Sequence, residues 1–285
     1  MNRAEDAFRA DIVEIGRRMY ARGYVASNDG NISVRLDDAT ILTTPKSVSK
    51  GFMTTDMMVV VDLDGKKIRG TRDASSELLM HLEVYRNRPD VRAVVHAHPP
   101  IATGFAVAGI PLDRAVLAEV VTTLGSIPIA EYGTPSTPEL PAAVRKYIKA
   151  HDGLLLANHG ALTIGPDVYA AYYKMETIEH FAKISLVTRQ LGRENLLSRE
   201  EVHRLQELRG NYGIKAPAPI CADGSETAAS ADQASCQIVE APSSRGARLI
   251  PTDPADLDGE IRLSYRELTA LIEDAVKALL GGQHG

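Results

Sequence analysis

The chain has 285 residues, 44% of them apolar, and a formal net charge of −5 at pH 7. This length and composition predict a globular protein with a proper core, and the weak negative charge argues against nucleic acid or a membrane surface as a partner. The first twenty residues mix charged with apolar side chains and no long stretch is uniformly apolar, so we expect no signal peptide or membrane anchor and a cytoplasmic location.

The segment 1–215 alternates helical and strand-like patterns, which predicts one α/β domain. Apolar residues at helical spacing predict an opening helix that ends near Gly23. Three short strands are predicted next, at 31–36, 40–43 and 57–61. An amphipathic helix at 76–87 follows and stops before Pro89. Three further strands, the last two each followed by turn residues and a helix, are predicted at 91–97, 127–130 and 153–157. We therefore expect a mixed, largely antiparallel central sheet flanked by helices.

The composition changes after the first domain. Ala, Ser, Pro and Gly dominate residues 216–258, which predicts a flexible linker because such a segment buries too little apolar surface to offset its ordering entropy. Its cysteines, Cys221 and Cys236, are expected to be free thiols. Apolar residues then recur at helical spacing behind a Ser264–Glu267 capping box, which predicts an amphipathic helical tail at 259–285. This helix needs a surface, either on a partner protein, on its own domain or on a second copy.

The strongest local signal is VRAVVHAHPP, in which His96 and His98 lie two residues apart in a predicted strand. Side chains at this spacing point to the same face of a sheet, so the two imidazoles can chelate one metal ion. A third ligand is expected at His159, which follows another predicted strand, with Gly160 allowing a tight turn beside it. Three histidines leave one coordination position of zinc open, as in catalytic sites. The alternative is a set of ordinary surface or core histidines without a metal.

Glu77 stands at the predicted start of a helix, directly after Ser75 and Ser76. A helix N-terminus offers unpaired N–H groups and a partial positive charge, so the two serines can cradle a phosphate group. The carboxylate of Glu77 could instead serve only as a partner of the helix dipole. Two loops are further candidates for binding an anion, through Gly30, Asn31, Lys46 and Ser47. Either loop could also be an ordinary turn.

Five motifs occur in order within residues 5–215 and together resemble the class II aldolase/adducin family: S-N-D-G-N-I-S, T-T-P-K-S, A-S-S-E, H-A-H-P and N-H-G. Within that family the chain looks most like the L-fuculose 1-phosphate aldolases. The resemblance implies that Glu77 is the acid/base carboxylate beside a zinc ion, or beside Mn²⁺, Co²⁺ or Fe²⁺, bound by His96, His98 and His159. The residues implied to bind a ketose phosphate are Gly30, Asn31, Ser47, Ser75 and Ser76, with Lys46 adding charge.

The implied reaction splits a ketose 1-phosphate into dihydroxyacetone phosphate and a small aldehyde such as lactaldehyde. For this role Glu77 is expected to have a carboxyl pKa raised by its apolar or metal-proximal setting. Tyr212 matches a tyrosine motif that reaches into a neighbouring subunit's site, which implies a homotetramer, although it could also be a packing residue. The tail resembles the encapsulation peptides of bacterial microcompartment enzymes, which implies a shell protein as a partner.

Two departures from the pattern leave the substrate open. Ala115 stands where the L-fuculose 1-phosphate aldolases have a catalytic tyrosine, and Lys46-Ser47 replaces a small residue and a glycine. Glu119 could face the site but is expected to face solvent. Other members of the family remain alternatives, namely a 5-deoxyribulose phosphate aldolase, a methylthioribulose phosphate dehydratase, an epimerase or a decarboxylase. Epimerases have an aspartate at the position of Glu77, and a non-catalytic scaffold is disfavoured because the three histidines and Glu77 are all present.

Overall fold

The computed structural model describes residues 3–214, 220 and 269. The chain divides into two units, Met1–Ser244 and Arg245–Gly285. Both cysteines and nearly all of the predicted linker and tail therefore lie outside the described residues. Ile220, which we expected in the linker, is buried against Val121 and Val202. Among the described residues, no helix is both long and apolar enough to cross a bilayer.

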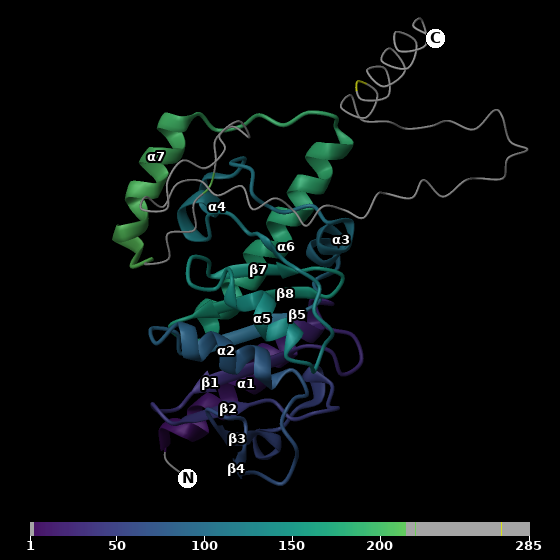
Figure 1. Cartoon of the computed structure of the whole chain (residues 1–285), viewed down its shortest axis with the longest axis vertical. Helices are drawn as coiled ribbons and strands as arrows, with labels where there is room; N and C mark the ends of the chain where they lie inside the picture. The colour runs from purple at the N-terminus through teal and green to yellow at the C-terminus, as the bar shows by residue number, and fades with distance from the viewer. Residues whose placement is uncertain (1–2, 215–219, 221–268, 270–285) are drawn as a thin grey trace, which may run out of the picture. The chain divides into compact units, whose positions relative to one another are not determined.

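Eight strands within the described residues form one sheet, in the order β4-β3-β2-β1-β5-β8-β7-β6 (Figure 1). All neighbouring strands are antiparallel except β6 and β7, which are parallel, so the predicted mixed and largely antiparallel sheet is confirmed. The strands are β1 Asn31–Arg35, β2 Thr40–Thr43, β3 Val59–Asp62, β4 Lys67–Arg69, β5 Ala93–Ala97, β6 Ile129–Ala130, β7 Gly153–Leu156 and β8 Gly160–Gly165.

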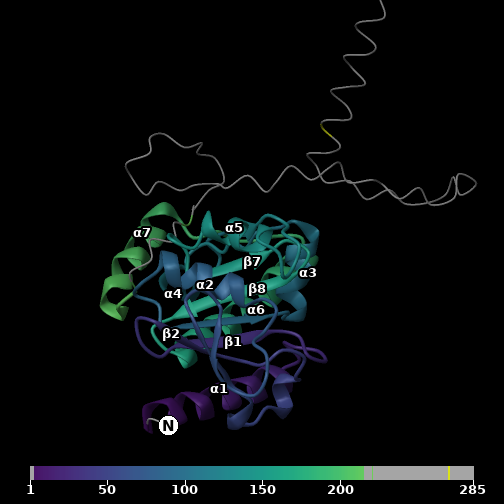
Figure 2. The same cartoon turned by 60° about the horizontal axis from the view of Figure 1, so that its bottom comes forward.

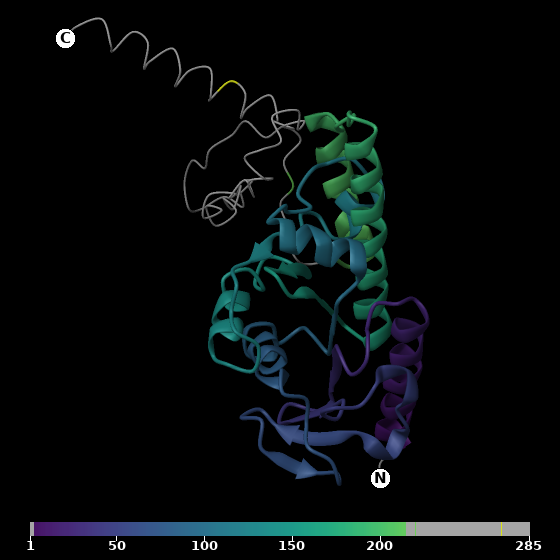
Figure 3. The ribbon, with the colours of Figure 1, turned by 90° about the vertical axis from the view of Figure 1, so that its right-hand side faces the viewer.

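Helices cover both faces of the sheet. Seen from the side, α1 and α6 lie on one face and α2 and α5 on the other (Figure 3), and Figure 2 shows α1 beneath β1 and β2. The α-helices are α1 Arg3–Ala21, α2 Leu78–Asn87, α3 Pro100–Ala108, α4 Ala118–Thr123, α5 Glu139–Arg145, α6 Val168–Gln190 and α7 Arg199–Leu208. Three short 3₁₀ turns are η1 Lys50–Phe52, η2 Thr55–Met57 and η3 Arg209–Tyr212.

The sheet separates two apolar cores, and alternation along β5 decides which core each side chain joins. Val95 packs in the core under α1, α3 and α6, whereas Val94 packs in the core under α2 and α5. Because residues two apart share a face of the strand, His96 lies on the same face as Val94 and is directed toward the α2 side. The strand thus brings His96 to the layer in which α2 begins.

One strand at the centre of the sheet was not predicted. Residues 160–165 were expected to be turn and helix, but they form β8, which pairs with β5 and β7 along its length. Every residue of β8 is buried, so its sequence shows no polar and apolar alternation. A short, fully buried strand of this kind cannot be distinguished from a helix by periodicity.

Candidate active site

Three histidines meet at one end of the central strands. His96 lies in β5 and is fully buried, His98 follows β5 directly, and His159 lies in the turn between β7 and β8. Their ring centroids are 4.7 to 5.0 Å apart, and one ring nitrogen from each lies within 4.8 Å of the others. The predicted grouping of His96, His98 and His159 is therefore present in the fold.

The orientation of the rings fits a divalent cation. The Nε2 atoms of His96 and His98 are 3.2 Å apart, close to the roughly 3.3 Å that separates two nitrogens of a tetrahedral zinc site. Nδ1 of His96 lies 2.8 Å from the carbonyl oxygen of Ala161, and Nδ1 of His98 lies 3.4 Å from the carboxylate of Asp29. Outer partners of this kind fix the ring and direct the other nitrogen inward. Burial, followed by the neighbouring histidines, lowers the pKa of His98 to about 3, so this imidazole is neutral, as a metal ligand must be.

Gly160 allows the turn between β7 and β8 to approach the histidines. A Cβ atom at this position would lie 2.5 Å from the carbonyl oxygen of Ala97 and 2.6 Å from Cδ2 of His98. Two residues earlier in this turn, Asn158 has a φ of 55°, in the left-handed region that asparagine tolerates. Glycine is therefore required here for close packing rather than for a positive φ.

We expect Gly160→Ala to displace His98 or the start of β8 and to weaken metal binding by about 10- to 100-fold, the range seen when support of a metal ligand is disturbed. Competition with a chromophoric chelator measures this affinity. Gly104→Ala is the matched control, since a Cβ atom there meets nothing within 4 Å and alanine favours its helix. Unchanged metal affinity in Gly160→Ala would contradict the close packing described here.

Glu77 lies beside the histidines, at the N-cap position of α2. Its Oε1 is 3.0 Å from Nε2 of His159, its Oε2 is 3.4 Å from Nε2 of His96, and Asn31 donates an amide hydrogen bond to Oε2 at 2.8 Å. Burial raises the pKa of this carboxyl, but His96 and His159 together lower it by a larger amount. The net shift of the pKa is therefore downward. The expectation of a pKa raised by an apolar or metal-proximal setting was wrong because it left out the effect of the two imidazoles.

His98, His159 and Glu77 line a cavity of about 360 Å³. Every residue that the sequence proposed for the phosphate group lines it, namely Gly30, Asn31, Lys46, Ser47, Ser75 and Ser76. The N-terminus of α2 faces the cavity through Ser75, Ser76 and Glu77, and Ser47 has a φ of 59°, a strained conformation for a serine. Serine hydroxyls, backbone N–H groups at a helix start and a lysine together suit an anion.

Sequence reasoning missed part of the cavity wall. Pro135 and Ser136, which follow β6, contribute to it, and so does Lys50 in η1. Lys50 is 1% exposed, although the sequence Ser49-Lys50-Gly51 is typical of an exposed turn. Nothing in the sequence marks this lysine as buried, since its burial depends on how η1 packs against α1.

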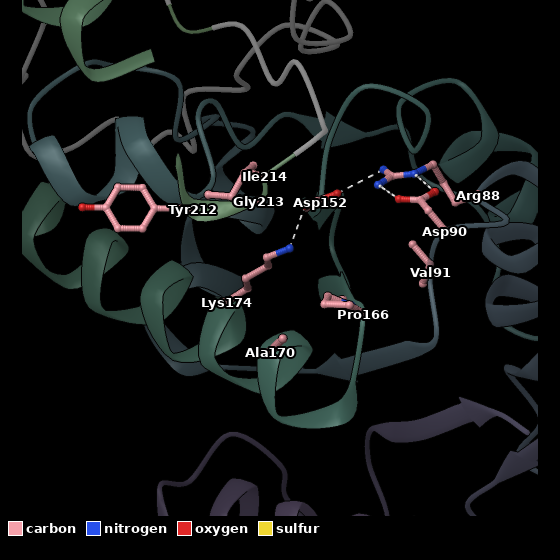
Figure 4. Close-up of a pocket in the computed structure, with 11 residues that line it drawn as sticks. Arg88, Asp90, Val91, Asp152, Pro166, Ala170, Lys174, Tyr212, Gly213 and Ile214 are labelled. Atoms are coloured by element: carbon pink, nitrogen blue, oxygen red, sulfur yellow. Dashed lines mark hydrogen bonds and ion pairs between the residues drawn. The ribbon is translucent and has the colours of Figure 1, made fainter. Parts of the chain in front are cut away.

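Tyr212 lies in a cavity different from the one that His98 and His159 line. It is 68% exposed and lines a second cavity of about 250 Å³ with Arg88 and Asp152, residues that lie near the starts of β5 and β7, whereas His98 follows the end of β5. Figure 4 shows its ring pointing away from the ion pairs that join Asp152 to Arg88 and Lys174, at 3.0 and 2.6 Å. Tyr212 therefore does not line the histidine cavity of its own subunit, and its role in a neighbouring site stays a prediction.

Ala115 and Glu119, two positions considered from the sequence, are also not among the residues that line the histidine cavity. Ala115, which stands where the resemblance implies a tyrosine, is completely buried. It packs in an apolar cluster with Val121, Val202 and Ile220. Glu119 is exposed in the first turn of α4, in agreement with the solvent-facing interpretation.

Known proteins with similar sequences indicate the family of this chain. Residues 10–186, more than half of the chain, match the model of the Class II Aldolase and Adducin N-terminal domain. A 3-oxo-tetronate 4-phosphate decarboxylase from Pectobacterium atrosepticum is 32% identical over 65% of this chain and 86% of its own length. An L-fuculose phosphate aldolase from Methanococcus maripaludis is 34% identical over 64% of this chain and 97% of its own.

Solved structures agree with the sequence comparison. The crystal structure of L-fuculose-1-phosphate aldolase from Thermus thermophilus superposes with a TM-score of 0.59 and 31% identity, covering 68% of this chain and all of that one. The chain belongs to the class II aldolase and adducin family.

Proposed function

We propose that this protein cleaves a carbon–carbon bond in a small phosphorylated ketose, releasing dihydroxyacetone phosphate and a small aldehyde such as lactaldehyde. The observation that carries the proposal is the position of Glu77, which contacts His96 and His159 and also lines a cavity walled by serines. A general base beside three metal-ligating histidines and an anion site are the parts that such a reaction needs.

A divalent cation held by His96, His98 and His159, zinc or else Mn²⁺, Co²⁺ or Fe²⁺, would supply Lewis-acid stabilisation of the negative charge that develops on the substrate's carbonyl oxygen. Glu77 is ionised at neutral pH and accepts or returns the proton of the carbon or hydroxyl at the bond that breaks. Asn31 holds this carboxylate through a hydrogen bond to Oε2, which also faces His96, while Oε1 faces His159.

The phosphate group of the substrate binds in the same cavity, beside the serines rather than beside the histidines. Ser75 and Ser76 offer hydroxyls just before the start of α2, and Ser47 and Gly30 line the same cavity. Both Gly30 and Ser47 have positive φ values, of 72° and 59°. A Cβ at Gly30 would lie 2.8 Å from the carbonyl oxygen of His96, so this loop packs closely on the metal ligand.

Decarboxylation of a phosphorylated oxo-sugar acid is the second candidate. It develops the same negative charge beside a carbonyl group, and one of the relatives is a decarboxylase of this kind. Lys46 lines the cavity, is exposed to solvent and offers a cation that a substrate carboxylate would use.

Product analysis distinguishes the two reactions. We expect equimolar dihydroxyacetone phosphate and aldehyde from at least one of L-fuculose, L-rhamnulose or 5-deoxyribulose 1-phosphate, with loss of release on adding a chelator. Carbon dioxide from 3-oxo-tetronate 4-phosphate, with no aldehyde from any of the ketose phosphates, would overturn the aldolase and establish the decarboxylase.

A further inference from the structure

Lys50 is a fully buried cation at the wall of the active-site cavity. Its Nζ donates to the carbonyl oxygens of Asn28 at 3.0 Å and Val48 at 2.6 Å. The turn that carries it is pressed against α1, since a Cβ at Gly16 would lie 2.6 Å from the carbonyl oxygen of Lys50. Its ammonium therefore has a fixed position between two loops.

The charge of Lys50 is not balanced by an adjacent carboxylate in the described part of the chain, where its acceptors are these two carbonyls. The acidic groups that act on it, Asp29 and Glu77, lie beyond hydrogen-bond contact. Burial lowers the pKa of Lys50 to about 8, against the opposing effect of these two carboxylates. A buried ammonium without an ion-pair partner is costly, so its position beside a cavity points to a ligand that supplies the negative charge.

The two carbonyls hold the ammonium of Lys50 beside the loops that are expected to bind the phosphate group. Asn28 belongs to the loop that leads to Gly30, and Val48 directly follows Ser47, so Lys50 joins the two loops that face the N-terminus of α2. These loops contain the strained Ser47, whose positive φ needs support from its surroundings. The bonds from Lys50 provide such support.

We propose that Lys50 is a positioning residue for the anionic group of the substrate: it holds the two loops together and supplies the buried positive charge that a phosphate dianion balances. This inference rests on the proposed function for the presence of a phosphorylated substrate. It differs from the role of Lys46, which is exposed and whose charge is screened by water.

Calorimetric titration of the metal-loaded protein with inorganic phosphate tests the proposal without turnover. We expect Lys50→Met to bind phosphate about tenfold more weakly, as for the loss of one charged partner in a low-dielectric site. The control Lys67→Met removes an exposed lysine paired with Asp73 and should bind as the wild type does. A folded, metal-loaded Lys50→Met protein with unchanged phosphate affinity would overturn the proposal. Lys50 would then serve only to connect the two loops.

The pH dependence of phosphate affinity in the unmodified protein provides a second test that needs no folded variant. Because the charged form of Lys50 is the one that favours the anion, affinity should hold up to about pH 8 and weaken above it. The groups that face Lys50 are Asp29, Glu77 and Lys46 around the cavity, and Tyr20 of α1 packs on the adjacent Gly51. A flat affinity up to about pH 9.5 would contradict the proposal.

Kinetics separate this inference from the proposed function. With a substrate that is turned over, Lys50→Met should raise KM about tenfold and leave kcat within a few-fold, because the charge acts on binding rather than on the bond that breaks. If no ketose phosphate is cleaved, the phosphate titrations still decide the role of Lys50. If a ketose phosphate is cleaved but Lys50→Met leaves phosphate affinity unchanged, the inference about Lys50 is wrong and the proposed function stands.

Discussion

Replacing Glu77 with glutamine is expected to lower kcat by about 10²- to 10⁴-fold, the usual contribution of a positioned general acid or base. Glutamine keeps the shape of the side chain and can still accept the hydrogen bond from Asn31, but it cannot take a proton. Metal content and thermal stability should therefore remain close to those of the unmodified protein. Steady-state rates together with metal analysis measure both parts of this prediction.

A matched control removes a different carboxylate. Glu119 is exposed on α4 and outside the cavity, so Glu119→Gln should retain full activity. If Glu77→Gln cleaved the substrate at a rate similar to that of the control, Glu77 would be only a partner for the start of α2 or for the histidines. The acid/base role would then have to move to another group of the cavity wall.

Substituting His98 with alanine is expected to weaken metal binding by at least about 100-fold and to abolish activity, because a direct ligand contributes more than the residues that orient it. His98 is suited to this test because it follows β5 rather than lying inside it, so its removal disturbs the strand least. Chelator competition gives the affinity and a coupled assay gives the rate.

His203 offers the control for this substitution. It is exposed on α7 and pairs with Glu207 in the same helix, so His203→Ala should leave metal affinity and activity unchanged. Retention of tight metal binding by the His98→Ala protein would show that the cation is held by another group, with Glu77 or Asp29 as the neighbouring candidates.

Much of this site could be predicted from the sequence because its residues come in short local patterns. The spacing of His96 and His98 is a property of one strand, and Ser75, Ser76 and Glu77 form one helix start. His159 required more, since it joins the others only through the pairing of β5 with β8, a strand that periodicity did not reveal. It was expected as a third ligand because it follows the predicted strand at 153–157 and precedes Gly160, and the resemblance to the family implied the same role.

The parts that could not be predicted depend on contacts between distant segments. Lys50 is buried because α1 closes over η1, and a sequence pattern that is typical of an exposed turn gives no sign of this. The downward shift in the pKa of Glu77 likewise depends on His96 and His159, which lie on other elements. Electrostatic effects of this kind follow from three-dimensional neighbours, which the sequence alone does not identify.

The register of the sheet explains why these distant residues meet. Asn31 on β1 is directly opposite His96 on β5, and its side chain reaches across to Glu77 at the start of α2. On the same strand, Ser33 bonds to His81 and Tyr85, which follow Glu77 at successive turns of α2. Polar residues of β1 thus hold α2 in register with the sheet, and with it the carboxylate beside the histidines.

The metal content of protein purified without chelator tests whether the three histidines hold a catalytic cation. We predict about one divalent ion per chain, lost together with carbon–carbon bond cleavage on chelation and restored with it on adding zinc or manganese. Full cleavage activity in protein shown to contain no divalent metal would contradict it.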